Sequence, residues 1–239
     1  MNLQQKSYAL RLRVLEMMHI GEKPVFSQKG LVTSLAWGME GKVDYVLEGN
    51  INYTGAVTKW VVEELGLLSS SKEAGPVAQS ADTTYLVPAF TGLGVPYWDS
   101  GAKAMLYGMS RTTGRAEIVK AAEECIAYQI ADVLELMGQE AGVAIQELRV
   151  DGGPTKDNFL MQFQSDILNL PVAAPEREEL SGMGAAFCAG IVAGVYSKEI
   201  FQAVRRSRFL PGMEAALRRK KREGWKQAVE TLLTRPGTK

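Results

Sequence analysis

The sequence has few of the side chains that most often build metal sites and acid-base centres, since its 239 residues include one histidine and two cysteines. A single imidazole, His19, cannot supply the several nitrogen ligands of a zinc site, and scattered carboxylates do not predict a Ser-His-Asp triad around it. Cys125 and Cys188 both fall in apolar helical patterns, so we expect two buried free thiols. We therefore predict no metal site, no disulfide and no hydrolase centre.

An excess of one charge and long apolar runs are also missing. The 27 basic residues equal the 27 acidic ones in number, which removes any global electrostatic reason for binding nucleic acid or a membrane surface. No run reaches the roughly 18 apolar residues of a membrane-spanning helix, and the first residues lack the apolar segment of a signal peptide. These absences, with a hydrophobic content of 46%, predict a soluble cytoplasmic protein with neither nucleic acid nor membrane as partner.

One local cluster of positive charge, Arg218 to Arg222, could by itself mark a nucleic-acid or localisation patch. Its flanking residues Leu217, Trp225 and Val229 instead favour a C-terminal amphipathic helix with a solvated basic side. We adopt the helix.

The most informative feature present is Asp151-Gly152-Gly153, which follows the apolar run 147–150 and precedes an amphipathic segment beginning at Pro154. The pattern predicts a strand, a glycine turn and a helix N-terminus. A side chain at either glycine would block close backbone approach, and the first N–H groups of a helix favour negative charge. A phosphate or a nucleotide is the ligand this geometry suits, and a plain tight turn is the alternative.

Hydrophobic periodicity predicts an α/β fold. Three antiparallel strands are expected at 11–20, 31–37 and 43–47, with a turn at 38–41. Helices are expected at 55–65, 116–141, 155–168 and 182–195, extended segments at 85–90, 105–107, 147–150 and 172–174, and a flexible polar loop at 69–80. A mixed sheet of three antiparallel strands followed by parallel ones, flanked by helices, is the ribonuclease-H-like plan of actin-type ATPase domains.

Four segments resemble the FGGY family of carbohydrate kinases, its glycerol kinases in particular. Residues 150–166 resemble the family's adenosine-binding segment, and the loop 88–99 resembles its proline-aromatic loop. Residues 47–60, with Leu47-Glu48-Gly49, Gly55-Ala56 and Trp60, are similar to another family segment, and 181–186 resemble the small-residue helix at the domain interface of actin-like ATPases. The resemblance runs from Met17 to Val229 in the family's order.

The resemblance implies an enzyme that phosphorylates glycerol or a related polyol with ATP and Mg²⁺. Members contain two actin-like domains, and residues 1–239 correspond to a single C-terminal, nucleotide-binding domain. The N-terminal domain, which carries the catalytic aspartate and the polyol contacts, is expected to be absent, so no catalytic residue is assigned. Residues 7–16 stand where the family has a glycine-rich phosphate loop, and they contain no glycine. We expect a disturbed loop there.

By the same resemblance, Gly55, Lys59, Gly152, Gly153 and Asp157 are the nucleotide-binding residues. Lys59 stands where many members carry glutamine; it could pair with phosphate oxygens or simply be solvated. Asp157 stands where asparagine is usual, and its carboxylate would repel phosphates unless it faces the ribose or a metal.

Three other features carry expectations. Glu123 replaces an aliphatic residue of the family, and we expect it to be partly solvated or paired, because an unpaired buried carboxylate is costly. The small residues of 182–190 predict close packing of a helix against a neighbour. In the aromatic loop, Tyr97 and Trp98 are expected to be exposed for a domain or subunit contact, or to belong to a rigid structural loop.

We expect the isolated chain to be inactive, to bind nucleotide weakly or not at all, and to form a homo-oligomer through its incomplete cleft. Two alternatives stay open. The chain could be a non-catalytic actin-like relic that acts only in self-association, or a fragment of another FGGY sugar kinase such as a xylulose kinase.

Overall fold

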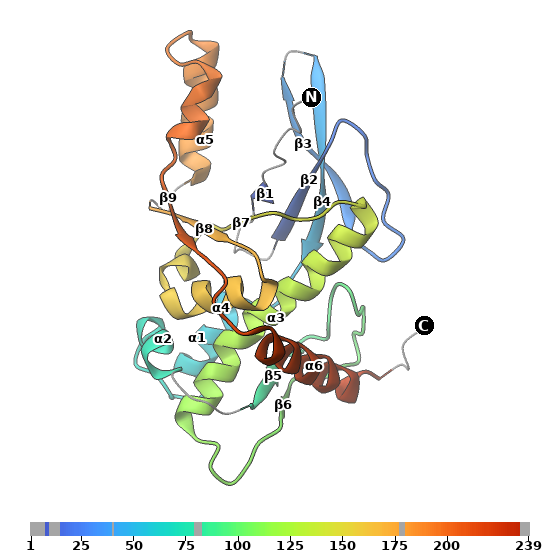
Figure 1. The fold of residues 1–239 in the computed structure, drawn as a ribbon, viewed down its shortest axis with the longest axis vertical. Helices are drawn as coiled ribbons and strands as arrows, with labels where there is room; N and C mark the ends of the chain where they lie inside the picture. The colour runs from blue at the N-terminus through green and yellow to red at the C-terminus, as the bar shows by residue number, and fades with distance from the viewer. Residues whose placement is uncertain (1–7, 10–14, 40, 79–82, 177–179, 235–239) are drawn as a thin grey trace.

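The computed structural model describes residues 8–9, 15–39, 41–78, 83–176 and 180–234 (Figure 1). Its first sheet consists of β2 (Leu15–Gly21), β4 (Lys42–Asn50) and β3 (Val32–Met39), with β4 in the middle and antiparallel to both neighbours. Gly41, at the turn between β3 and β4, has φ 76°, a left-handed conformation that favours glycine. The predicted set of three antiparallel strands is confirmed, except that residues 10–14 lie outside the described part.

A second sheet has the order β1 (Tyr8–Ala9), β7 (Leu148–Arg149), β8 (Val172–Pro175), β9 (Arg206–Phe209). The first three strands are parallel and β9 runs antiparallel to β8. Strands β5 (Tyr85–Val87) and β6 (Met105–Tyr107) form a separate antiparallel pair. The predicted mixed α/β architecture is confirmed. Strands β1 and β9 were not expected, since β1 has only two residues and the two arginines of β9 hide the apolar signal of a strand.

Helix α3 (Arg115–Ala141) is the central element, and it extends over nearly the range predicted from the sequence. Helices α1 (Gly55–Glu63), α2 (Ala74–Val77) and α4 (Asn158–Leu168) pack against it. It also lies close to the first sheet at Gly49, where an added Cβ would come within 2.3 Å of Cγ1 of Val133. Nearly all of the buried apolar side chains join one core around this helix.

The predicted flexible loop at 69–80 is wrong for its described part. The 3₁₀ helix η1 (Ser71–Glu73) and α2 lie there, and Ala74 and Gly75 are buried. The segment is ordered because it packs against α3 and α4. Its small residues, which suggest a loop by composition, permit this close contact.

Helix α5 (Leu180–Val192) projects away from the rest of the molecule (Figure 1). None of its described residues is buried, and Val192 is 90% exposed. The expectation of close packing therefore holds only where an added Cβ at Gly190 would come within 2.2 Å of Tyr196 and where Phe187 meets Phe201, and described elements leave most of the helix uncovered. Cys188 is exposed for the same reason, whereas Cys125 in α3 is buried as predicted.

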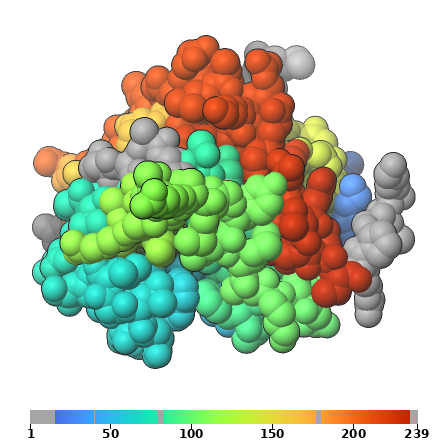
Figure 2. Space-filling view, turned by 90° about the horizontal axis from the view of Figure 1, so that it is seen from below, coloured from blue at the N-terminus to red at the C-terminus, as the bar shows by residue number. Residues whose placement is uncertain are grey.

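After the 3₁₀ helix η3 (Lys198–Ala203) and β9, the chain ends in α6 (Ala215–Leu232), which buries Trp225, Ala228 and Val229. In a space-filling view from below, the red surface of α6 lies on the opposite side of the green surface from the cyan surface of α1 and α2 (Figure 2). Its basic side is only partly solvated. Lys221 and Arg222 are 12% and 16% exposed and pair with acidic side chains of α3, which corrects the prediction from the sequence. In the described ranges, no helix combines the length and apolar composition needed to cross a membrane.

Candidate nucleotide site

A large cavity opens where α1, α2, α3 and α4 meet the glycine turn. Its volume is about 1120 Å³, slightly above the roughly 300–1,000 Å³ of most ligand pockets. The lining residues are Gly55, Thr58, Ser71, Lys72, Gly75, Pro76, Glu123, Gly153, Pro154, Lys156, Asp157, Asn158, Phe159, Leu160, Gln162, Phe163 and Asp166. This cavity is the candidate functional site.

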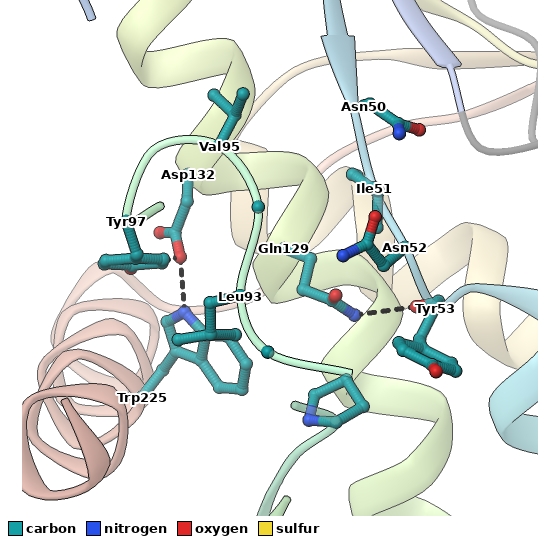
Figure 3. A pocket seen from close by; sticks show the side chains of 13 residues that line it. Asn50, Ile51, Asn52, Tyr53, Leu93, Val95, Tyr97, Gln129, Asp132 and Trp225 are labelled. Carbon is teal, nitrogen blue, oxygen red and sulfur yellow. Dashed lines mark hydrogen bonds between the residues drawn. The ribbon is translucent and has the colours of Figure 1, made fainter. Parts of the chain in front are cut away.

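A second cavity, beside Asp132 and Trp225, measures about 20 Å³, enough for about one water molecule (Figure 3). The aromatic loop closes one side of it. Tyr97 is half-buried there and its hydroxyl donates a hydrogen bond of 2.7 Å to Asp132, so the expected exposure of Tyr97 is wrong. Trp98 is 58% exposed as expected, and its indole donates to the carbonyl of Lys29.

The two glycines of the turn have different tasks. Gly152 has φ 97° and ψ 175°, a conformation that is essentially restricted to glycine. Its carbonyl accepts hydrogen bonds from the backbone N–H and the hydroxyl of Thr155, which close the turn. A Cβ at Gly153 would meet no atom within 4 Å, and Gly153 lines the cavity. Gly152 thus forms the turn, and Gly153 leaves space for a ligand.

Asp157 caps the helix that follows. Its Oδ1 accepts from the backbone N–H groups of Phe159 at 2.8 Å and Leu160 at 3.2 Å. The predicted helix at 155–168 therefore begins at Asn158, after the 3₁₀ turn η2 (Gly153–Lys156). Because a carboxylate already satisfies these two N–H groups, the expectation that they receive a phosphate is wrong. The negative charge of Asp157 is stabilised by the helix itself.

Glu123 brings a carboxyl group into the cavity wall from α3. It is 2% exposed, and the hydroxyl of Thr58 in α1 donates a hydrogen bond of 2.8 Å to its Oε1. Burial raises the pKa of Glu123 to about 7; the hydrogen bond from Thr58 lowers it and the charge of Asp157 raises it. The sequence predicts that Glu123 is partly solvated or paired, and the hydrogen bond from Thr58 confirms that it is paired.

Apolar and basic groups complete the lining. The rings of Phe159 and Phe163, one turn apart on α4, are stacked at 6.2 Å between centroids and 5° between planes. Lys72 and Lys156 are exposed at the rim. Sequence reasoning missed these four residues, although the spacing of two aromatic residues by four positions was a signal for a shared helix face.

The five residues assigned by resemblance do not all meet. Gly55, Gly153 and Asp157 line the cavity together, and the nearest atom to a Cβ at Gly55 would be Cγ of Pro154 at 3.7 Å. Gly152 lies in the adjoining turn. Lys59 is exposed on α1, and its Nζ lies 3.6 Å from Oε1 of Glu63. It is not among the described residues that line the cavity.

Among the described residues, no group of three or more His, Cys, Asp or Glu side chains is arranged to hold a metal ion. The single histidine, His19, instead pairs with Asp44 at 2.5 Å.

Comparison with known proteins identifies the family. The profile of the FGGY family of carbohydrate kinases, C-terminal domain, matches residues 15–193. A glycerol kinase of Caldanaerobacter subterraneus subsp. tengcongensis is 43% identical over 222 residues, which are 90% of this chain and 44% of that protein. The chain therefore spans just under half the length of such curated relatives.

Solved structures agree with this assignment. The chain superimposes on Plasmodium falciparum glycerol kinase, crystallised with ADP, with a TM-score of 0.88 at 32% identity, over 95% of this chain and 47% of that one. A ligand-bound xylulose kinase of Lactobacillus acidophilus, at 22% identity and a TM-score of 0.80, shares the fold. The predicted actin-like α/β fold is confirmed, and the chain belongs to the FGGY family of carbohydrate kinases, whose C-terminal domain it contains.

Proposed function

We propose that the large cavity binds an adenine nucleotide and that the chain supplies the nucleotide-binding part of an ATP-dependent kinase for glycerol or a related polyol. The observation that carries the proposal is the cavity itself, which forms at the turn where Gly153 leaves open space. The relative from Plasmodium falciparum was solved with ADP, which supports a nucleotide as the ligand.

The lining suits the parts of such a ligand. The stacked rings of Phe159 and Phe163 offer an apolar surface to a base, and the exposed Lys72 and Lys156 offer positive charge to phosphates at the rim. Base and phosphates would thus be recognised by different walls.

Mg²⁺, when bound, would neutralise phosphate charge during transfer. Two carboxylates of the lining are already engaged by backbone N–H groups. Asp157 caps α4, and Oδ1 of Asp166 accepts from the N–H groups of Gly212 and Met213. We therefore propose that the ion enters with the nucleotide's phosphates and is not held by a preformed carboxylate cluster.

Binding by the 239-residue chain should be weak, with a Kd of roughly 1 mM, because the contacts available are mainly to the nucleoside and the two lysines at the rim are exposed to solvent, which screens their charge. ATP and ADP should bind about equally. Gly153→Val should abolish binding of both, because it fills space that the ligand needs. Gly184→Val, in the projecting helix α5 where an added Cβ would meet no atom within 4 Å, is the matched control.

Calorimetric titration with both nucleotides tests this proposal. Micromolar affinity with a strong preference for ATP would reveal a phosphate site beyond the one proposed. Unchanged binding by Gly153→Val would show that the glycine turn has no role in recognition.

We also propose that the chain, by itself, does not phosphorylate glycerol, since the resemblance places the catalytic aspartate in the other domain. A coupled assay of ADP release with glycerol, ATP and Mg²⁺ should give background rates, and turnover well above background would refute this. Homo-oligomerisation and a cytoplasmic location stay predictions. The exposed apolar side chains of α5 favour self-association. Self-association would be the remaining function if the chain were a non-catalytic actin-like domain.

A further inference from the structure

The cavity wall contains one buried ionisable side chain, Glu123, where the family resemblance leads one to expect an aliphatic residue. The side chain is almost completely shielded from solvent, yet it lines the cavity, and Thr58 fixes one of its two oxygens. A carboxyl group buried this deeply in the wall would favour a ligand that offers it complementary hydrogen-bond partners.

We propose that Glu123 reads the edge of the nucleobase, selecting adenine when its carboxyl group is neutral and guanine when it is ionised. This inference rests on the proposed nucleotide-binding function. It adds a specificity-determining residue and a dependence on pH to that function.

The chemistry follows from hydrogen-bond inventories. A neutral carboxyl group offers one O–H donor and an accepting oxygen, and adenine offers a ring nitrogen acceptor beside its amino donor. The two can form a complementary pair. A carboxylate can only accept hydrogen bonds, so it cannot bond to the ring nitrogen of adenine, which is also an acceptor. The neighbouring N–H donors of guanine could instead donate to its oxygens. The proton involved exchanges with solvent, and no bond of the ligand changes.

Several polar and charged groups face Glu123 from the elements packed around it. From α1 it faces the hydroxyl of Thr58, and from the start of α4 it faces Asp157, whose Oδ1 accepts from the N–H groups of Phe159 and Leu160. Lys72 of η1 and Lys156 of η2 line the same cavity at the exposed rim. Asp166, farther along α4, is engaged by two backbone N–H groups.

On its own helix, Glu123 is flanked by two more ionisable side chains. Cys125 has a pKa raised by burial and by the charges of Glu123 and Glu124, so the thiol stays neutral in this range. Glu124 pairs with Lys221 at 2.9 Å. Burial in the wall places the pKa of Glu123 itself at about 7.

The test uses adenosine and guanosine, because nucleosides lack phosphates that would titrate in the same range. Binding is measured by ligand-observed NMR at pH 6 and pH 8 for the wild type, Glu123→Gln and Glu123→Leu. Glu63→Gln, at an exposed position of α1, is the control. Circular dichroism confirms that each variant is folded.

We expect adenosine affinity of the wild type to fall about three- to tenfold from pH 6 to pH 8, the effect of one hydrogen bond, and guanosine affinity to rise. Glu123→Gln, which keeps a donor and an acceptor, should bind adenosine at both pH values as the wild type does at pH 6. Glu123→Leu should be weaker at pH 6 and insensitive to pH, and the control should behave as the wild type.

Adenosine binding that is independent of pH in the wild type, or a pH dependence that persists in Glu123→Gln, would overturn this inference and leave the nucleotide site standing. Absence of binding of either nucleoside to the wild type at both pH values would overturn the proposed function, and the inference with it.

Discussion

The indole N–H of Trp225 donates a hydrogen bond of 2.6 Å to Oδ2 of Asp132, which joins the C-terminal helix α6 to the central helix α3 (Figure 3). Tyr97 donates to the same oxygen, and Arg222 bonds Oδ1 at 2.9 Å. Burial raises the pKa of Asp132, and the guanidinium of Arg222 opposes this. One buried carboxylate thus holds both α6 and the aromatic loop against α3.

Replacing Asp132 by alanine should lower the free energy of unfolding by about 3–5 kcal/mol, because it leaves Arg222 and two other donors without their acceptor. Glu135→Ala is the matched control, since Glu135 pairs with the same arginine at 2.9 Å but its side chain is 47% exposed. Its loss should cost no more than about 1 kcal/mol. Urea denaturation of both variants measures the difference, and equal losses would contradict this account of the junction.

Glu16 in β2 should be a source of instability. It is 1% exposed, and its two carboxyl oxygens have no hydrogen-bond partner among the residues that the structure describes. Burial, followed by the charge of Asp132, raises its pKa. Glu16→Met should raise the free energy of unfolding by about 1–3 kcal/mol, because a similar volume is filled without an unsatisfied polar group. Glu22→Met, at a side chain that is 67% exposed, should change it by less than about 0.5 kcal/mol. A lowered urea midpoint for Glu16→Met would argue against this assignment.

Glu123 should make stability depend on pH. Its pKa is raised on folding from 4.5 to about 7, so its contribution to stability is fully present below pH 4.5 and is lost as the pH rises to about 7. Relative to Glu123→Gln, the wild type should therefore lose about 3 kcal/mol over this window, at about 1.4 kcal/mol per pH unit, and little more above it. Thermal unfolding of the wild type and Glu123→Gln between pH 4.5 and pH 8 measures this loss. If the stabilities of the two proteins changed in parallel with pH, Glu123 would not titrate in this window.

The projecting α5 should drive self-association of the isolated chain. Val192 and Val195 are 90% and 69% exposed, and solvent-exposed apolar patches favour contact with another surface. We expect sedimentation velocity to show a concentration-dependent oligomer, and the double change Val192→Lys with Val195→Lys to shift it towards monomer. Phe26→Lys, at an exposed phenylalanine far from α5 in the sequence, should leave association unchanged. A wild type that is monomeric at high concentration would rule out this surface as an interface.

Elements with strong local signals could be predicted from the sequence. Helix α3 has an apolar pattern over its whole length, and the strands β3 and β4 alternate around a turn that contains Gly41. The glycine turn before Pro154 was also recognisable, because only glycine adopts the backbone of Gly152 easily. These features depend on the residue's own conformational preferences, so the sequence alone determines them, along with the order of elements and membership of the FGGY family.

Tertiary structure decided the partners of the polar side chains. Asp157 turned out to be a helix cap, Lys59 the ion-pair partner of Glu63, and Lys221 and Arg222 partners of acids about 90 positions away in the sequence. Tertiary structure also decided that Glu123 forms a cavity wall with Thr58, and that α5, despite its small apolar residues, contacts η3 but buries none of its described residues. Burial and pairing depend on which distant segments come together. A local pattern therefore shows what a side chain can do, and the fold determines which groups it meets.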